Sequence, residues 1–140
     1  MENHSDISKN FIPYYLALEL KELGFDEPCF AFYGLSRDDY KTIRLSIFQN
    51  LKTDYLPDVH HLDVTCDAPL YQQAFRFFRE KYGLHYIICK NIQMDGYGYR
   101  EVILIPYMEE NENTIFKTYE EAEIACLVKL IEIAKEQNVK

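Results

Sequence analysis

The chain has 140 residues, of which 48% are hydrophobic and 15% aromatic, with twelve Tyr, nine Phe and no Trp. A chain of this size and composition can bury a substantial core, which excludes a largely disordered protein. The formal net charge of −8 argues against ordinary nucleic-acid binding, because Lys and Arg supply most of the affinity for phosphate.

The polar start of the sequence and the lack of a long apolar run predict a cytoplasmic protein. Residues 1–11 begin as a polar stretch without the apolar region of a secretory signal, and we expect a flexible N-terminal segment there. No run approaches the roughly 18 apolar residues of a membrane span. We expect the remaining residues, 12–140, to form a single domain.

The first third of the chain predicts one helix and two strands. A helix is expected over 13–23, with Pro13 as its first residue and leucines at helical spacing behind it. A short aromatic strand should cover 29–33 and end before Gly34. Residues 42–48 alternate between apolar and polar side chains, which is typical of a half-buried strand.

The middle of the chain shows weaker hydrophobic periodicity, and a second helix is predicted after it. Residues 49–60 show no period and predict an irregular loop, and the alternation over 62–66 predicts an edge strand. Asp67 is expected to cap a helix that runs to Tyr82, with Gly83 as its C-terminal signal.

The clearest hairpin lies in the second half. Residues 84–92 and 99–106 are predicted strands joined by a turn at Asp95-Gly96, and because both are apolar on both faces we expect them to lie centrally in the sheet. An acidic loop is expected over 109–113. Thr118 and Glu121 form a capping box for a final helix over 118–136.

The last helix is apolar around much of its circumference. Such a helix is either sandwiched within the fold or partly covered by another chain, which would make a homodimer through 118–136. Both alternatives remain open from the sequence.

A short pattern recurs at the start of each predicted helix: Tyr14-x-x-Ala17, Tyr71-x-x-Ala74 and Tyr119-x-x-Ala122. Residues three apart share a helix face, so we interpret the pattern as packing of Tyr and Ala against a sheet. The elements then predict an α+β fold with two layers, a mainly antiparallel sheet and the order αββ-αββ-α. The repeat is either a duplication or convergent helix chemistry.

Four residues are the candidate contact surface. Arg76 and Arg79 fall on the polar face of their helix, in the region 69–107 where five basic residues outnumber three acidic ones, and Tyr97 and Tyr99 are expected to be exposed at the hairpin tip. Arg and Tyr are enriched at interface hot spots. The plainer alternative is a solvated helix face paired with Glu80.

No cofactor, metal site or catalytic residue is expected. His60-His61-x-Asp63-x-x-Cys66 contains zinc-ligand types but lacks the second ligand pair that a structural site needs. The carboxylates of 109–112 and of Glu120-Glu121-x-Glu123 are interpreted as solvated, since a helix first turn favours negative charge.

The cysteines are interpreted as buried, reduced thiols that act as small hydrophobic residues. They are Cys29, Cys66, Cys89 and Cys126, each scattered singly within an apolar run and without a Cys-x-x-Cys pair.

Three segments carry a family resemblance: 12–30, 71–82 and 118–127. Together they resemble a family of small uncharacterised proteins of gut Bacteroidota and their phages, in which Trp often replaces Phe77. The likeness covers most of the chain and is weakest around 36–66. It supplies no activity, cofactor or catalytic residue, and its phage and mobile-element association implies an accessory role, such as binding a host protein or a nucleotide signal.

These observations lead to two functional hypotheses. The first is a non-enzymatic protein-interaction or inhibitor module acting on a host factor, with a basic protein as the natural partner, because residues 1–68 hold twelve acidic residues against six basic ones. Such a domain could present carboxylates to a basic groove, as DNA mimics do. The alternative is a small-ligand, nucleotide-like binder with a pocket lined by Tyr86, Tyr99 or Arg76.

Overall fold

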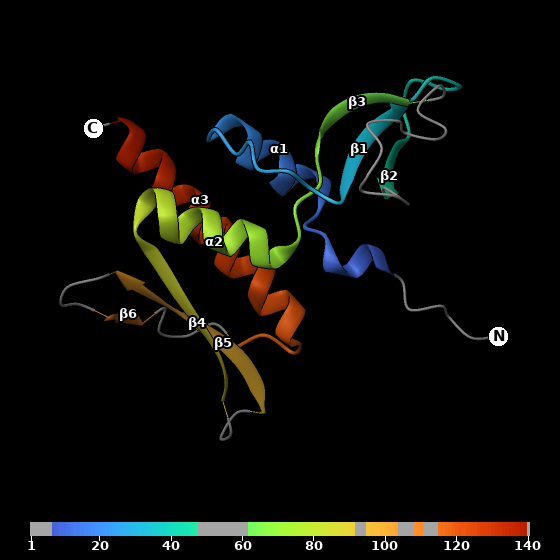
Figure 1. The fold of residues 1–140 in the computed structure, drawn as a ribbon. Coiled ribbons are helices and arrows are strands. Elements are labelled where there is room, and N and C mark those ends of the chain that lie inside the picture. Colours follow the sequence, from blue (N-terminus) through green and yellow to red (C-terminus); the bar gives the residue numbers. More distant parts are fainter. Residues whose placement is uncertain (1–6, 48–61, 92–94, 104–107, 111–114, 140) are drawn as a thin grey trace. The chain divides into compact units, whose positions relative to one another are not determined.

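The computed structural model describes residues 7–47, 62–91, 95–103, 108–110 and 115–139. The chain divides into two compact units, Met1–Gln72 and Gln73–Lys140, and each is described by itself (Figure 1). The described strands form two three-stranded sheets with antiparallel pairing throughout, which confirms the α+β class and the expected alternation of helices and strands. The single domain expected over 12–140 stays a prediction.

The described elements follow one another in this order: η1 (Ile7–Asn10), α1 (Tyr14–Glu22), β1 (Ala31–Ser36), β2 (Ile43–Ile47), β3 (Leu62–Asp67), α2 (Tyr71–Tyr82), β4 (Leu84–Asn91), β5 (Gly96–Ile103), β6 (Met108–Glu110) and α3 (Tyr119–Val139). The predicted loop over 49–60 lies wholly outside the described residues.

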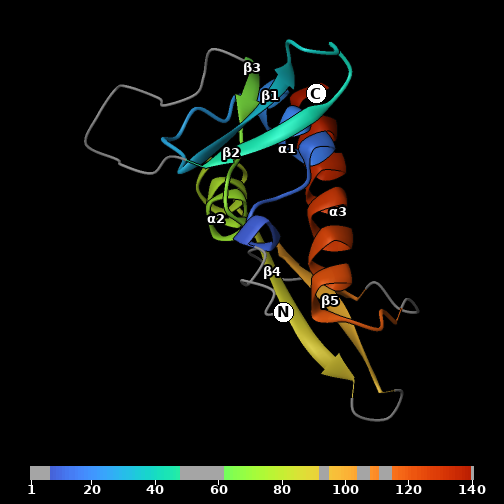
Figure 2. The same cartoon turned by 90° about the vertical axis from the view of Figure 1, so that its right-hand side faces the viewer.

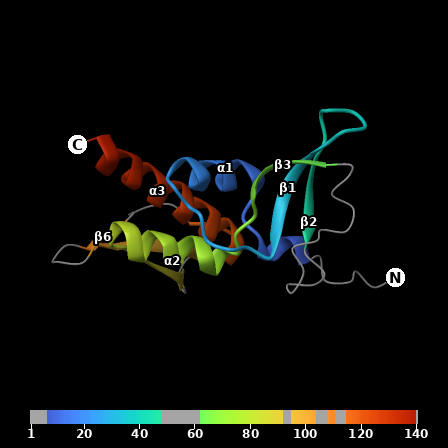
Figure 3. The same ribbon diagram turned by 45° about the horizontal axis from the view of Figure 1, so that its top comes forward.

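The first unit packs α1 against a sheet of order β2-β1-β3 (Figure 3). Tyr33 of the central strand ties the two layers together. Its hydroxyl donates a 2.6 Å hydrogen bond to the carbonyl oxygen of Ile12, and its ring meets Tyr14 edge-on at 5.3 Å between centroids. Burial of apolar side chains on both sides of β1 provides the core of the unit, which includes Leu16, Ala17, Leu20, Leu23, Phe25, Ala31 and Phe32.

Three boundaries in this unit differ from the sequence predictions. The strand expected over 29–33 continues through Gly34, because a register shift between Tyr33 and Gly34 accommodates the glycine inside the strand. Asp67 is the last residue of β3 and does not cap α2. Phe11, placed by the sequence in the N-terminal segment, is buried and pairs with Leu70 in a β-bridge.

The second unit packs α2 and α3 against a sheet of order β4-β5-β6 (Figure 2). Phe75 of α2 stacks on Tyr86 of β4 with 3.7 Å between ring centroids. The side-chain amide of Asn138 on α3 donates a 3.1 Å hydrogen bond to the hydroxyl of Tyr82 at the end of α2. The first contact joins α2 to β4, and the second joins α3 to α2.

The sheet of the second unit corrects two expectations. Only β5 is central, whereas β4 is an edge strand among the described residues, and Ile87 on β4 is 45% exposed. Part of the predicted acidic loop, at Glu109 and Glu110, belongs to β6, which pairs with β5. The apolar character of β4 on both faces therefore did not indicate a central position.

The start of α3 confirms Thr118 as the predicted cap, while the returning bond of Glu121 reaches Lys117, one residue before the cap. The hydroxyl of Thr118 accepts a 3.2 Å hydrogen bond from the backbone N–H of Glu121, and the Glu121 carboxylate accepts one of 3.2 Å from the N–H of Lys117. Six residues of α3 are buried, but Val128 is 37% exposed. In the described part of the chain, no helix combines the length and apolar character needed to cross a membrane.

The Tyr-x-x-Ala pattern marks the first turn of every α-helix described. Its tyrosines are the first residues of α1, α2 and α3, and its alanines, Ala17, Ala74 and Ala122, are all buried. Tyr119 is packed only in part: its ring is 41% exposed, although one edge-on contact joins it to Tyr97 of β5. The strand orders β2-β1-β3 and β4-β5-β6 differ, so the repeat does not extend to sheet topology.

Candidate functional site

The polar face of α2 presents two arginines. Arg76 and Arg79 are exposed, three residues apart, while Phe75 and Phe78 on the opposite face are buried. Within the described part of the chain, neither guanidinium forms an ion pair with a carboxylate. The ion pairing with Glu80 that the sequence suggested as the plainer alternative is therefore not found among the described contacts. The two arginines present positive charges on the outer face of α2.

Lys81 extends the positive charge of this helix but is engaged locally. Its ammonium group lies 5.4 Å from the ring centroid of Phe77 and 5.5 Å from that of Tyr82. Such cation–π contacts are attractive because the ring face carries negative charge density. Arg76 and Arg79 are therefore the cations of α2 best placed to meet a partner.

The hairpin tyrosines differ from the sequence prediction. Tyr99 is only 8% exposed, because its ring stacks on Phe116 with 6.2 Å between centroids. Tyr97 is half-buried, since its backbone pairs with Phe116 in a β-bridge and its ring meets Tyr119 edge-on at 6.0 Å. The expectation that both are exposed is wrong for Tyr99.

A second group of side chains gathers where α3 begins. Glu123 and Tyr119 lie one turn apart on α3, and the edge-on contact of Tyr119 with Tyr97 joins them to β5. On β4, Tyr86 is held by its stack on Phe75 and interacts electrostatically with both Tyr119 and Glu123. The group thus brings together residues from α2, α3 and both long strands of the sheet.

The surroundings shift the pKa values of the ionisable side chains in this cluster. Burial raises the pKa of the Glu123 carboxyl above its ordinary value of 4.5, and the negative charge of Glu120 adds to the effect. Burial also raises the pKa of the Tyr119 and Tyr86 hydroxyls. The nearby charge of Arg79 acts in the opposite direction and lowers the pKa of Tyr86.

Sequence reasoning missed Glu123 because it treated all the glutamates of this first turn as solvated. Glu120 and Glu121 are exposed as expected, but Glu123 is half-buried. A signal was present in the spacing: Leu127 and Leu130, four and seven residues further along α3, are both fully buried. Glu123 shares a helix face with these two leucines and therefore lies on the apolar side of the helix.

The cysteines confirm the buried interpretation only in part. Cys66 and Cys126 are buried, Cys29 is half-buried and Cys89 is exposed. Burial, helped by the negative charges of Asp67 and Glu27, raises the pKa of the Cys29 thiol to about 12, so this thiol is a poor nucleophile at neutral pH.

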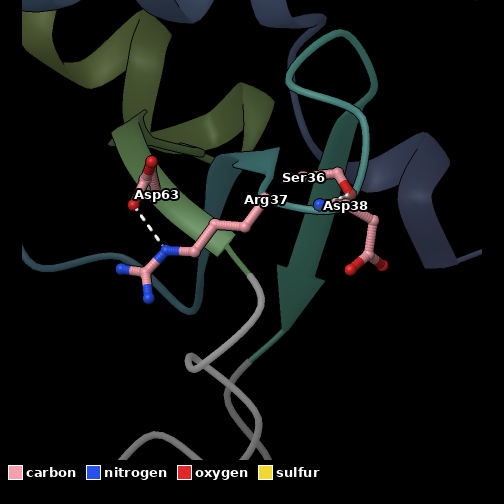
Figure 4. A network of polar contacts seen from close by, with 4 residues as sticks. All are labelled: Ser36, Arg37, Asp38 and Asp63. Carbon is pink, nitrogen blue, oxygen red and sulfur yellow. Dashed lines mark hydrogen bonds and ion pairs between the residues drawn. The ribbon is translucent and has the colours of Figure 1, made fainter.

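The connection between β1 and β2 is a compact polar turn. Figure 4 shows Arg37 reaching across to Asp63 of β3, with 2.7 Å between Nε and Oδ1, while the hydroxyl of Ser36 accepts a 3.3 Å bond from the N–H of Asp38. Both Arg37 and Asp63 are about half exposed, so their pair contributes little to stability. This turn organises the end of the sheet.

Metal binding finds no support in the described residues. No group of three or more His, Cys, Asp and Glu side chains there is arranged to hold an ion. His60 and His61 of the sequence motif lie outside the described residues, and Asp63 is engaged with Arg37.

Comparisons with family models, curated proteins and solved structures found no match to this chain.

Proposed function

We propose that this chain is a non-enzymatic interaction module that binds a protein partner through the outward face of α2. The observation that supports this best is the pair of exposed guanidinium groups on Arg76 and Arg79, which have no carboxylate partner within the described residues. Arginine is a frequent hot-spot residue because its planar donors can bind carboxylates in two-point geometry. The partner surface at this point should carry acidic groups.

The charge of the first unit favours a partner that also has a basic surface. Residues 1–72 contain twelve acidic and six basic residues, whereas residues 73–140 contain eleven and nine. Long-range attraction between oppositely charged surfaces speeds association and weakens with salt. An inhibitor that covers a basic groove of a host factor would fit this charge, and the family resemblance to phage-associated proteins supports the same role in a cytoplasmic setting.

Charge reversal on α2 tests the proposal directly. We expect the double variant Arg76→Glu with Arg79→Glu to lose at least about tenfold in affinity for a protein captured from bacterial lysate, because two interface charge pairs become repulsive. The matched control is Lys9→Glu with Lys41→Glu, which makes the same change in net charge at exposed positions of the first unit.

Capture is measured by quantitative mass spectrometry, followed by titration of the complex with salt. Unchanged recovery of every captured protein by the α2 double variant would contradict the assignment of this face. A complex that is insensitive to salt would contradict the charge argument.

A small-ligand binder is the second candidate, because Arg79 acts on the half-buried Tyr86 and the two could hold an anionic ligand together. Ligands that bind only the folded state raise its melting temperature. A rise in Tm with nucleotides that the α2 double variant abolishes would favour this candidate over the protein partner.

We also propose that α3 mediates a homodimer. The support is the exposed Val128 on a helix that already buries six residues within the chain. Apolar surface on an amphipathic helix is often covered by a second copy.

A further inference from the structure

The outer edge of β4 carries unpaired backbone groups. Tyr97 of β5 exchanges two backbone hydrogen bonds with Phe116, 2.7 and 2.8 Å long, so its N–H and carbonyl point away from β4. These groups alternate in direction along an antiparallel strand, so Gly98 faces its β4 partner, Cys89, with both of its own. The alternate β4 residues direct both groups to the free edge, namely Tyr86, Ile88 and Lys90. Among the described residues, these groups have no hydrogen-bond partner.

An edge strand is commonly blunted by a bulge, a proline or a charged side chain. The edge strand β3 of the first unit shows such devices: a register shift between Tyr33 and Gly34 interrupts its pairing with β1, and the ammonium group of Lys21 donates a 2.7 Å hydrogen bond to the carbonyl oxygen of Thr65. β4 pairs with β5 without a shift, contains neither proline nor carboxylate, and carries its one lysine, Lys90, next to its last residue. β4 is therefore the edge better suited to accept a further strand.

The two faces beside this edge differ in chemistry. Tyr86 points to the face that α2 covers, where it stacks on Phe75. Arg79 follows Phe75 by one turn and is exposed, so it lies on an uncovered flank of α2. Because α3 lies on the β5 side of α2 (Figure 2), this flank is on the side of the free edge. The opposite face of β4 exposes Ile87, which is 45% accessible, and Cys89.

We propose that the free edge of β4 binds an extended segment of a protein partner as an additional strand. Alternate side chains of such a segment point to opposite faces of the sheet. Those on the α2 face meet Arg79 and should be acidic, whereas those on the other face meet Ile87 and should be apolar. This inference rests on the proposed interaction function and specifies how the partner presents its acidic groups.

Hydrogen exchange followed by NMR tests the edge in the unchanged chain. The probe is an acetylated and amidated peptide of alternating Val and Glu with the length of β4. We expect it to slow exchange at the amides of Tyr86, Ile88 and Lys90, and to change little at those of Ile87 and Cys89, which point to β5. Protection that does not follow this alternation would overturn the proposal.

A second peptide, with Lys in place of Glu, tests the charge of the bound segment. It should bind at least about tenfold more weakly, because Arg79 attracts one peptide and repels the other. Equal affinity of the two peptides would overturn the acidic assignment.

Proline substitution tests the backbone bonds themselves. Ile88→Pro removes an N–H that points outward and should weaken binding of the Val-Glu peptide by at least about tenfold, whereas Ile88→Val keeps this N–H and should retain binding. Thermal melts check that each variant is folded. Lys90→Pro, compared with Lys90→Ala, repeats the test at an exposed side chain. Unchanged affinity in both folded proline variants would contradict strand addition.

The remaining outcomes separate this edge from its rivals. Protection of the outward amides that appears without peptide and rises with protein concentration would assign the edge to a second copy of the chain and overturn the proposal. If the peptide does not bind while the Arg76→Glu and Arg79→Glu double variant still loses capture, the β4 site is wrong and the interaction function stands. If the peptide binds and the double variant captures every protein as wild type does, the β4 site stands and the α2 face is wrong.

Discussion

At the residue scale, two carboxylates show how surroundings decide ionisation. Glu123 is half-buried and its pKa is raised, chiefly by burial. Asp39 is fully exposed, and its carboxylate accepts hydrogen bonds from the hydroxyl and N–H of Thr42 and from the N–H of Lys41, which lower its pKa to about 2. Hydrogen bonds to the ionised form and loss of water act in opposite directions on the same chemical group.

Asp39 provides a pH-dependent prediction. Because its pKa is lower in the folded chain than its ordinary value of 3.8, its contribution to stability is present above that value and is lost as the pH falls toward 2. We expect Asp39→Asn to lower the Tm by a few degrees at pH 7, and the difference from wild type to shrink toward pH 2. Thermal melts across this range measure it, with Asp38→Asn as the neighbouring control. A difference that stays constant with pH would contradict the role of the Asp39 charge.

The residue scale also shows which site predictions the sequence could make. Arg76 and Arg79 were predictable, because a strong helical period separates a polar from an apolar face. The burial of Tyr99 was not, because it depends on a neighbour distant in sequence. Phe116 covers Tyr99 from a segment that follows the hairpin. Glu123 shares a helix face with the buried Leu127 and Leu130, so its spacing carried a signal of partial burial that the prediction did not use.

At the element scale, helix ends were predicted well and strand neighbours poorly. Gly24 and Gly83 have φ of 92° and 67°, which suits glycine at a helix C-terminus, and α1 closes with a bond from the N–H of Phe25 to the carbonyl of Leu20. These signals are local. The edge position of β4 and the pairing of β6 with β5 instead depend on which strands form hydrogen bonds with one another.

The N-terminus of α3 yields a prediction at this scale. Thr118→Ala removes the hydroxyl that accepts the N–H of Glu121 and should lower the free energy of unfolding by about 1 kcal/mol. Thr118→Ser keeps an accepting hydroxyl and is the control. Urea denaturation followed by circular dichroism measures both variants. A loss as large in the Ser variant as in the Ala variant would show that the cap hydrogen bond is not the cause.

At the scale of the whole molecule, charge is unevenly divided along the chain. The excess of acidic over basic residues is concentrated in residues 1–72, while the α2 arginines lie in the other unit. The acidic excess and the outward arginines therefore lie on different segments of the chain. Their separation in sequence allows each to be altered without changing the other.

The proposed homodimer is tested at this scale. We expect light scattering to give twice the monomer mass of 16.7 kDa, and Val128→Lys to shift the protein to the monomer, because a buried unpaired charge is costly at an apolar interface. Val139→Lys, at the exposed end of α3, should remain dimeric. A monomeric wild-type chain would remove α3 as an interface.

The amino-acid sequence by itself determined the α+β class, the C-terminal ends of α1 and α2 and the outward position of Arg76 and Arg79, whereas α3 runs three residues beyond its predicted end. These features follow from periodicity and from glycine and capping signals, which act over a few residues. Only the tertiary structure decided the order of the strands, the burial of Tyr99 and the stacking of Phe75 on Tyr86. Each of these depends on which distant segments share a sheet or face the same core, and no local pattern encodes that choice.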